Sequence, residues 1–303
     1  MKKILFFTAL IILIPLVIVN VFIRNDEIKF IYTSNMQVRV KRTENEEIVS
    51  VPFEDYIIGV VAGEMPSSFE LEALKAQAVA ARSYVMKQMV YNKDKNYDVV
   101  DSVTNQVYLD DSDLKRVWKD DYTEKINKIK TAILETYNEY LEYDGKVIDA
   151  MFFSTSSGAT ENSEDVFSSS VPYLRSVAST WDSISPVYKV DYSFSLSDFY
   201  KKLGLSYSDT LDIQITDTTS TGRVKKLKIN GVALTASSIV SALSLKSSYF
   251  TITLSDKIVY ITTKGYGHGV GMSQYGAQAM ALQGYNYKDI LSYYYQGTDL
   301  KKI

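Results

Sequence analysis

Cysteine is absent from the 303 residues, and histidine occurs once, at His268. The lack of cysteine excludes a disulfide scaffold and a cysteine nucleophile, and it fits either a cytosolic protein or an exported one that folds without disulfides. With one histidine and no thiol, a zinc site would have to be built from carboxylates, which is unusual. We therefore expect no metal and no other cofactor.

The chain also has no excess of basic residues. Its formal net charge is -3, and charged residues make up 23% of it. A nucleic-acid partner calls for a basic face and is therefore not expected. The sequence has only 2 Trp but 24 Tyr. Tyrosine rings suit sugar recognition because they pack on pyranose faces, yet they equally suit half-buried sheet surfaces. No P-loop, Rossmann or G-x-S-x-G spacing is present.

One uncharged apolar run, from Ile4 to Ile23, follows Lys2 and Lys3. Its length suffices to cross a hydrocarbon core, and the basic flank predicts that the N-terminus stays in the cytoplasm while the rest is exported. A cleaved signal peptide is the alternative, but the run exceeds a usual h-region and no clear small-x-small site precedes Asp26. We therefore expect a single-pass membrane protein with an uncleaved anchor.

The central stretch begins with a predicted helix that carries an acid on its apolar side. Read as a helix from about Pro52, it places Ile57, Val60 and Val61 on one stripe, and Glu64 continues that stripe. An ionisable group at a position that periodicity assigns to the buried side indicates a special role.

The end of this helix is predicted from Pro66, which disfavours helical geometry at Met65. Glu64 then lies near unpaired carbonyls and the negative end of the helix dipole. That field and partial burial both favour the protonated carboxyl, which is the form a general acid needs.

A second helix is expected directly afterwards, because Ser67 and Glu70 have the spacing of a capping box. An alternative to catalysis at Glu64 is an ordinary salt bridge at the rim of this helix pair. Its partner would then be Arg82 or Lys75.

The stretch GVVAGEMPSSFELEALKAQAVAARSY closely resembles the core signature of the stage II sporulation protein D family, which are peptidoglycan lytic transglycosylases. Three further stretches agree with it in family order: Gln106-Val107-Tyr108, residues 154–177 and residues 265–298. Together they span nearly the whole chain beyond the N-terminus. The resemblance implies that Glu64 is the catalytic acid.

The resemblance also implies a substrate and partners. The substrate would be peptidoglycan glycan strands, stripped of stem peptides by a partner amidase and cleaved to 1,6-anhydro-muramic acid ends during sporulation and engulfment. A cell-wall amidase and other sporulation membrane proteins are the expected partners. The rival from another class is a non-catalytic wall-binding enhancer of such an amidase. A hydrolase would need a second carboxylate, such as Glu161 or Asp165.

The matching stretches imply a set of substrate-binding candidates. These are Arg82, Tyr84, Gln106, Tyr108, Ser154, Thr160, Glu161, Asn162, His268, Ser273, Gln274 and Tyr275.

Two of these groups have structural alternatives. The loop from Ser154 to Asp165 is equally consistent with a loop whose Ser, Thr and Asn side chains satisfy its own backbone. For His268, a structural role is the alternative, because a lone histidine is more often structural than catalytic and this one, among glycines, could shape the floor of a cleft. Where some family members hold a metal with His and Cys, this chain has Phe153, Ser156 and Ala159.

Other patterns predict the surrounding elements. A hairpin is expected around Thr43–Glu46, a helix from about Tyr122 capped by Asp121 and Glu124, and a tight hairpin at Asp144-Gly145. Helices are expected from Ser273 and over residues 287–295.

The predicted fold class is α+β, with a helical catalytic core, β-hairpins and a smaller strand-rich lobe at about residues 191–263 that includes one short helix. Residues 1–25 form the cytoplasmic stub and anchor, and residues 26–303 form the extracytoplasmic domain.

Overall fold

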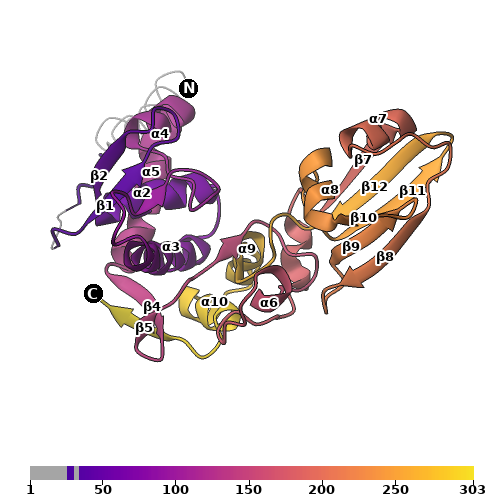
Figure 1. Cartoon of the computed structure of the whole chain (residues 1–303). Coiled ribbons are helices and arrows are strands. Elements are labelled where there is room, and N and C mark those ends of the chain that lie inside the picture. The colour runs from indigo at the N-terminus through magenta and orange to yellow at the C-terminus, as the bar shows by residue number, and fades with distance from the viewer. Residues whose placement is uncertain (1–25, 31–33) are drawn as a thin grey trace, which may run out of the picture.

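A computed structural model describes residues 26–30 and 34–303, so the predicted span over residues 4–23 lies outside the described residues. Among the residues that are described, no helix is both long and apolar enough to cross a bilayer. Figure 1 shows a helical part on one side and a strand-rich part on the other. We call residues 189–264 the lobe and the remaining described residues the body. Each has its own hydrophobic core, and the predicted α+β class is confirmed.

The body carries most of the helices. They are α2 (Phe53–Glu64), α3 (Leu71–Tyr91), α4 (Asp111–Trp118), α5 (Tyr122–Glu135), α6 (Ser163–Val166), α9 (Gln274–Leu282) and α10 (Tyr287–Tyr294), with the short 3-10 helices η1 (Lys119–Asp121) and η2 (Thr180–Ile184). Its strands are β1 (Gln37–Lys41), β2 (Ile48–Pro52), β3 (Val99–Val100), β4 (Glu139–Tyr143), β5 (Lys146–Val147), β6 (Phe152–Phe153), β13 (Met272–Ser273) and β14 (Asp299–Lys302).

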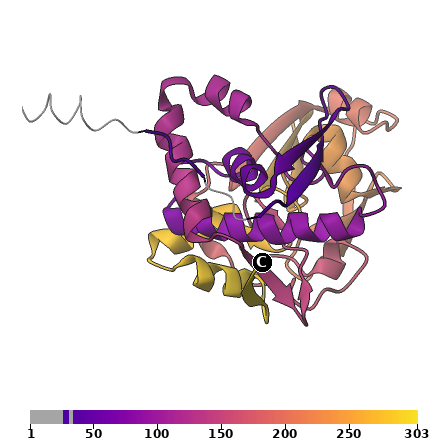
Figure 2. The same ribbon diagram turned by 90° about the vertical axis from the view of Figure 1, so that its left-hand side faces the viewer.

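The predicted first hairpin is confirmed and leads directly into α2. Strands β1 and β2 pair antiparallel, with Val38 opposite Val51 and Val40 opposite Val49. Val38, Val40 and Val51 point to one face and are buried, whereas Ser50 points to the other face and is exposed, so one face of the hairpin packs on the core. In Figure 2 the hairpin lies beside α3, the long purple helix that crosses the near face of the body.

Helix α2 ends at Glu64, as predicted from Pro66, but α3 begins later than predicted. It starts at Leu71, and no side chain caps it. Ser67 is therefore not its cap, because the residues after Pro66 form a turn that buries Phe69 against the core. The backbone N–H of Glu70 donates instead to Gln278 Oε1 on α9, at 2.6 Å.

The helix predicted from Tyr122 is present as α5, but its predicted cap is wrong. Asp121 has helical backbone angles, since the 3-10 helix η1 runs directly into α5, and its carboxylate pairs with Lys125 instead. The Asp144-Gly145 hairpin is confirmed, with positive φ at both residues between β4 and β5. Helices α9 and α10 also begin where the sequence predicts them.

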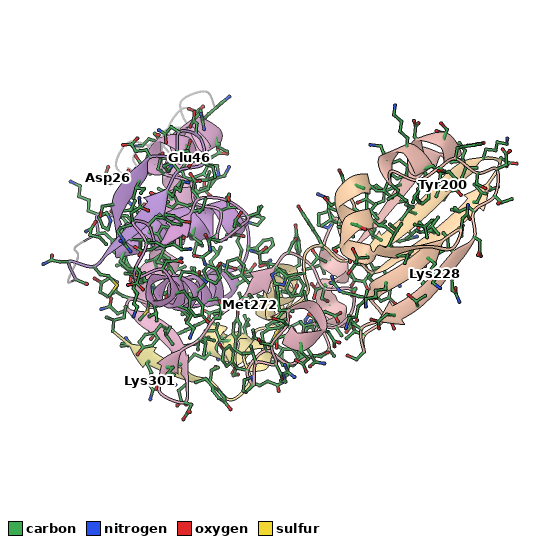
Figure 3. All side chains as sticks on the ribbon, in the orientation of Figure 1. Asp26, Glu46, Tyr200, Lys228, Met272 and Lys301 are labelled. Atoms are coloured by element: carbon green, nitrogen blue, oxygen red, sulfur yellow. The ribbon has the colours of Figure 1, made fainter. Side chains whose placement is uncertain are left out.

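The lobe contains two three-stranded antiparallel sheets and two helices. Its elements are β7 (Lys189–Ser195), α7 (Leu196–Lys202), β8 (Ile213–Thr218), β9 (Val224–Ile229), β10 (Val232–Thr235), α8 (Ala236–Leu243), β11 (Phe250–Ser255) and β12 (Ile258–Lys264). The first and last strands, β7 and β12, pair along their whole length, and Lys189 lies opposite Lys264. The chain therefore enters and leaves the lobe at one point. Met272, labelled in Figure 3, lies in the body near this junction.

Candidate active site

Glu64 is the last residue of α2, and two donors from distant segments reach its carboxyl group. The backbone N–H of Val107 donates to Oε1 at 2.7 Å, and the side-chain amide of Gln274 donates to Oε2 at 3.2 Å. The side chain is partly buried. Three segments that are far apart in the sequence therefore meet at this one acid.

Burial raises the pKa of Glu64 above its usual range, while the hydrogen bonds from Val107 and Gln274 act in the opposite direction. The net upward shift keeps more of the carboxyl protonated near neutral pH. The two donors stabilise the carboxylate that remains once the proton has left. This combination suits a group that must both hold a proton and release it.

The salt-bridge alternative for Glu64 is wrong. Arg82 is fully buried and forms a pair with Glu54, with Nε to Oε1 at 2.9 Å. Its guanidinium also donates to Thr136 Oγ1. Arg82, predicted as a substrate contact, is therefore enclosed among α2, α3 and α5, where it supports the helices.

Lys75, the other proposed partner of Glu64, pairs with Glu72 at 2.6 Å and with Glu135 at 2.5 Å. Within the described chain, no basic side chain lies within ion-pair distance of Glu64.

The predicted segment Gln106-Val107-Tyr108 does lie at Glu64, but its backbone makes the contact. Gln106 is fully buried and accepts a hydrogen bond from the Tyr56 hydroxyl at 3.1 Å. The Tyr108 ring stacks on Tyr56 at 5.3 Å between centroids and lines a pocket of about 400 Å³ that does not include Glu64. Within the described chain, neither side chain forms a hydrogen bond with the carboxyl group.

Tyr84, on α3, is a closer neighbour of the acid. Its hydroxyl accepts a hydrogen bond from Asn105 Nδ2 at 3.0 Å. Burial raises the pKa of Tyr84, the Asn105 bond opposes this, and the negative charges of Asp149 and Glu64 add to the rise. The hydroxyl thus remains a neutral donor and acceptor near Glu64.

Gln274 is presented by the glycine-rich stretch that precedes α9. Gly265, Gly267, Gly269 and Gly271 all have positive φ. At Gly271 a Cβ atom would lie 2.0 Å from the carbonyl oxygen of Met151, so only glycine fits there. This close approach lets β13 pair in parallel with β6, which fixes the start of α9.

Ser273 is the N-cap of α9, with its Oγ accepting from the backbone N–H of Gly276 at 3.2 Å. The same hydroxyl donates to the buried carboxylate of Asp182. Asp182 also accepts from the backbone N–H of Ser156 at 2.6 Å and from Ser179 Oγ at 2.5 Å. Ser273 therefore anchors Gln274 from behind and is itself buried.

Asp182 was missed from the sequence, because nothing in its local pattern distinguishes it from a surface aspartate. Burial raises its pKa, while the hydrogen bonds from Ser179, Ser273 and Ser156 act against that rise. The role of Asp182 emerges only from residues brought together by the fold.

Tyr275, on α9, contacts both Ser154 and the turn that follows Glu64. The backbone N–H of Tyr275 donates to the carbonyl oxygen of Ser154 at 3.0 Å. The Tyr275 ring meets Phe69 edge-to-face, with centroids 5.1 Å apart. Phe69 follows Glu64 in the turn before α3. This aromatic pair therefore connects the segment after Glu64 with helix α9, which carries Gln274.

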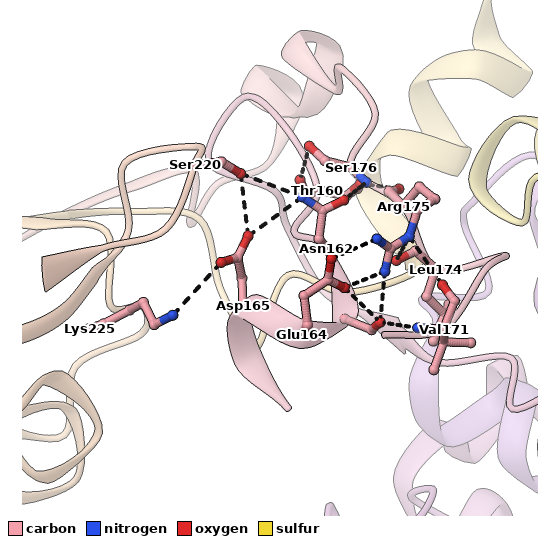
Figure 4. A network of polar contacts seen from close by, with 11 residues as sticks. Thr160, Asn162, Glu164, Asp165, Val171, Leu174, Arg175, Ser176, Ser220 and Lys225 are labelled. Atoms are coloured by element: carbon pink, nitrogen blue, oxygen red, sulfur yellow. Dashed lines mark hydrogen bonds and ion pairs between the residues drawn. The ribbon is translucent and has the colours of Figure 1, made fainter. Parts of the chain in front are cut away.

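The loop from Ser154 to Asp165 bonds mostly to the segment that follows it, residues 171–182. Thr160 Oγ1 is fully buried and accepts from the backbone N–H of Val177 at 2.9 Å, while Asn162 Oδ1 accepts from that of Ser176 at 3.0 Å. Figure 4 shows this network, in which Glu164 binds Arg175. The geometry thus favours a well-bonded loop for Thr160 and Asn162 over direct substrate contact.

Glu161 and His268 lie toward the lobe. Glu161 is fully buried and pairs with Arg223 Nε at 3.2 Å. His268 Nδ1 accepts from the backbone N–H of Val270 at 3.0 Å, and its ring packs 5.6 Å from that of Phe153. Burial, and then the charge of Arg223, lower the pKa of His268 to about 4. His268 is therefore neutral at physiological pH.

Two of the three positions at which the sequence would need metal ligands, Phe153 and Ser156, lie in apolar or hydroxyl surroundings. Phe153 and Ser156 are buried, and Ser156 Oγ donates to the carbonyl of Ser179 at 2.8 Å. Nowhere in residues 26–30 and 34–303 do three His, Cys, Asp or Glu side chains gather in a way that suits a metal ion.

Comparison with known proteins places this site in a family. A model described as "Stage II sporulation protein" matches residues 41–143, which include α2, α3 and the Val107 segment. Over 275 residues the chain is 45% identical to "Stage II sporulation protein D" of Bacillus amyloliquefaciens, covering 89% of this chain and 80% of that protein. The chain belongs to the stage II sporulation protein D family.

A second member of the family, "Stage II sporulation protein D" of Bacillus subtilis (strain 168), is 42% identical over 274 residues, with the same 89% and 80% coverage. The chain is also 31% identical to the "Amidase enhancer" of that organism, covering 80% of this chain but 40% of the relative. The family resemblance derived from the sequence is thereby confirmed.

Proposed function

We propose that the protein is a peptidoglycan lytic transglycosylase in which Glu64 acts first as an acid and then as a base. The observation that supports this most directly is the setting of Glu64, which is desolvated by burial and bonded to two neutral donors, with no cation paired to it among residues 26–30 and 34–303. A structural carboxylate is normally paired, whereas this one is arranged to exchange a proton.

The proposed reaction needs no second carboxylate. Glu64 protonates the oxygen that leaves muramic acid C1, and the glycosidic bond breaks through a positively charged, oxocarbenium-like state. The C6 hydroxyl of the same muramic acid then attacks C1 and gives its proton to the Glu64 carboxylate. A 1,6-anhydro end forms, no water is consumed, and Glu64 regains the proton it donated.

Glu161 and Asp165, the second carboxylates that a hydrolase could use, are not well placed to act together with Glu64. Glu161 is committed to Arg223. Asp165 lies 3.8 Å from Lys225 and 3.3 Å from the hydroxyl of Ser220. Both face the lobe, on the side of His268, so neither is an evident partner for Glu64.

We further propose that the natural substrate is glycan strands stripped of stem peptides by a cell-wall amidase, and that other sporulation membrane proteins are partners. We also propose that residues 4–23 anchor the domain outside the membrane. Protease added to intact protoplasts should then remove the folded domain. Protection of the domain there, or its release as a freely soluble chain, would contradict the anchor.

A second candidate function is a non-catalytic enhancer of an amidase, which the similarity to the "Amidase enhancer" favours. Both functions would use an exported wall-binding domain. They differ in whether glycosidic bonds are broken when no amidase is present.

Mass analysis of glycan products separates these functions. Purified residues 26–303 are incubated with denuded glycan strands, without any amidase. We expect products that end in 1,6-anhydro-muramic acid. Reducing ends would make the enzyme a hydrolase. Intact strands, together with stimulation of an amidase by the same domain in a separate assay, would favour the enhancer.

A further inference from the structure

A second pocket lies where the lobe meets the body. Its volume is about 560 Å³, and Glu64 does not line it. We call it the lysine pocket, after Lys225, Lys226 and Lys246, which line it together with Asp165 and the segment 266–268. Figure 4 shows its edge, where Asp165 faces Lys225.

Several charges in the lysine pocket cancel one another. Arg223, on the inner wall, is 2% exposed and pairs with Glu161 at 3.2 Å. Lys225 and Asp165 face each other at 3.8 Å. His268 is neutral because its pKa is lowered to about 4. These groups contribute little net charge.

Two lysines of the pocket remain outside the ion pairs of the described residues. Among the described residues, neither Lys226 nor Lys246 forms an ion pair, although Asp217 lies opposite Lys226 in the strand register. Lys246 is partly buried, and its Nζ lies 4.1 Å from the centroid of the Tyr266 ring. A partly buried ammonium with an aromatic ring as its nearest partner retains its capacity to bind an anion.

Lys246 is held firmly between the two parts of the molecule. Its backbone N–H donates to the Tyr192 hydroxyl at 3.1 Å, and its carbonyl accepts from the N–H of Gly267 at 3.1 Å. Its position is therefore fixed with respect to the glycine-rich stretch that also presents Gln274. These bonds fix the backbone of Lys246 and so limit the positions that its ammonium can occupy when a ligand binds.

The walls around these lysines are partly apolar. Val224, Val240 and Leu245 line the lobe side of the pocket, and Tyr266 lines the body side. An apolar wall beside an uncompensated ammonium suits an anion that is attached to a small apolar group. A lactyl ether fits this description, since it carries a methyl group next to its carboxylate.

We propose that the lysine pocket binds the free lactyl carboxylate of a muramic acid residue in the same glycan strand that Glu64 cleaves. This inference rests on the proposed function. His268 lines the pocket and Gln274 contacts Glu64, and these residues are six positions apart. Six residues span at most about 22 Å, so a strand of a few sugar units reaches both places.

The pocket would then select the substrate by its charge. While a stem peptide is attached, its amide bond neutralises the lactyl group, and removal of the peptide exposes the carboxylate. A subsite that reads this carboxylate makes stripped strands the better ligand.

The test uses equilibrium binding, with residues 26–303 carrying Glu64→Gln so that the ligand is not cleaved. The probes are denuded glycan oligosaccharides, the same oligosaccharides with their lactyl carboxylates converted to methyl amides, and free stem peptides. We expect the carboxylate form to bind about tenfold more tightly than the amide form, and less tightly as salt rises. Lys246→Met should abolish that difference, whereas Lys228→Met should preserve it. Lys228, labelled in Figure 3, is an exposed, unpaired lysine on β9 that does not line the pocket.

Equal binding of the carboxylate and amide forms would overturn the proposal, as would an unchanged preference in the Lys246→Met domain. Binding of free stem peptides that competes with the oligosaccharides and depends on Lys246 would also overturn it, because the peptide carboxylates would then be the ligand. Cleavage by the wild-type domain is measured separately. Cleavage without a preference for the carboxylate form would overturn this inference alone. A preference for the carboxylate form without cleavage would overturn the proposed function alone.

Discussion

At the scale of single residues, the site depends on how neighbouring groups shift the pKa of one carboxyl group, that of Glu64. The sequence sufficed to single out Glu64, because an acid on an apolar stripe before a proline stop is visible in the pattern. It also pointed to Gln274, through family resemblance. It did not reveal that the partners of Glu64 would be a backbone N–H and an amide, since both come from more than 40 residues away.

Replacing Gln274 tests this tuning. The Gln274 amide stabilises the Glu64 carboxylate, so Gln274→Leu should raise the pKa of Glu64 and move the basic limb of the pH profile of kcat/KM to higher pH. The optimum rate should fall ~10-fold or more, because a hydrogen bond to a charged group contributes about 1.5–3 kcal/mol. Gln283→Leu, at the exposed end of α9, should change neither. A basic limb that moves to lower pH would show that Gln274 does not favour the carboxylate.

His268 gives a second prediction, on stability. Its pKa is lowered to about 4, so between pH 6.5 and 4 the unfolded chain binds more protons than the folded one. The histidine contribution is therefore fully present above pH 6.5 and is lost as the pH falls through this window, by up to about 3 kcal/mol. Urea unfolding of wild type and His268→Asn at several pH values measures the effect. A difference in stability that stays constant between pH 7 and 4 would contradict it.

At the scale of elements, α2 is placed by its close contact with the 106–109 segment. A Cβ atom on Gly63 would lie 2.8 Å from the carbonyl oxygen of Val107, and one on Gly59 would lie 2.4 Å from that of Leu109. This neighbour of α2 was not foreseeable, because periodicity defines a face of a helix without identifying what packs on it.

The variant Gly63→Ala tests this contact. Alanine should favour the helix by about 1 kcal/mol, but overpacking against Val107 should cost about 1–3 kcal/mol and move the Val107 N–H away from Glu64. We expect a lower melting temperature and reduced cleavage. The matched variant Ala62→Ser, on the same turn, should alter both only slightly. A higher melting temperature with full activity would mean that the segment yields without loss.

The elements that were predicted correctly share a local cause. Helix α5, the Asp144-Gly145 turn and helix α10, capped by Asn286, are all specified within a few residues. The errors at Ser67 and Asp121 have a common origin in neighbouring structure. A turn that buries Phe69 moves the start of α3 to Leu71. The 3-10 helix η1 holds Asp121 in helical geometry, in which its side chain does not cap α5.

At the scale of the whole molecule, the lobe and the body meet along the glycine-rich stretch. The strand pair β7–β12 delivers the chain into residues 265–271, which run past the lysine pocket and end at Gln274. The sequence predicted a smaller strand-rich lobe. The charge arrangement at its junction with the body arises from residues spread over Asp165 to His268 and was not visible in the sequence.

The most direct measurement compares wild-type and Glu64→Gln domains on denuded glycan strands, with thermal melts of the same preparations. The substitution keeps the shape of the side chain and removes its proton. We expect cleavage to fall by ~10²- to 10⁴-fold and the melting temperature to change little. Glu70→Gln, an exposed glutamate whose side chain has no partner in the described chain, should match the wild type in both. Release of 1,6-anhydro ends by the Glu64→Gln domain at a rate similar to wild type would contradict the assignment of Glu64 as the catalytic acid.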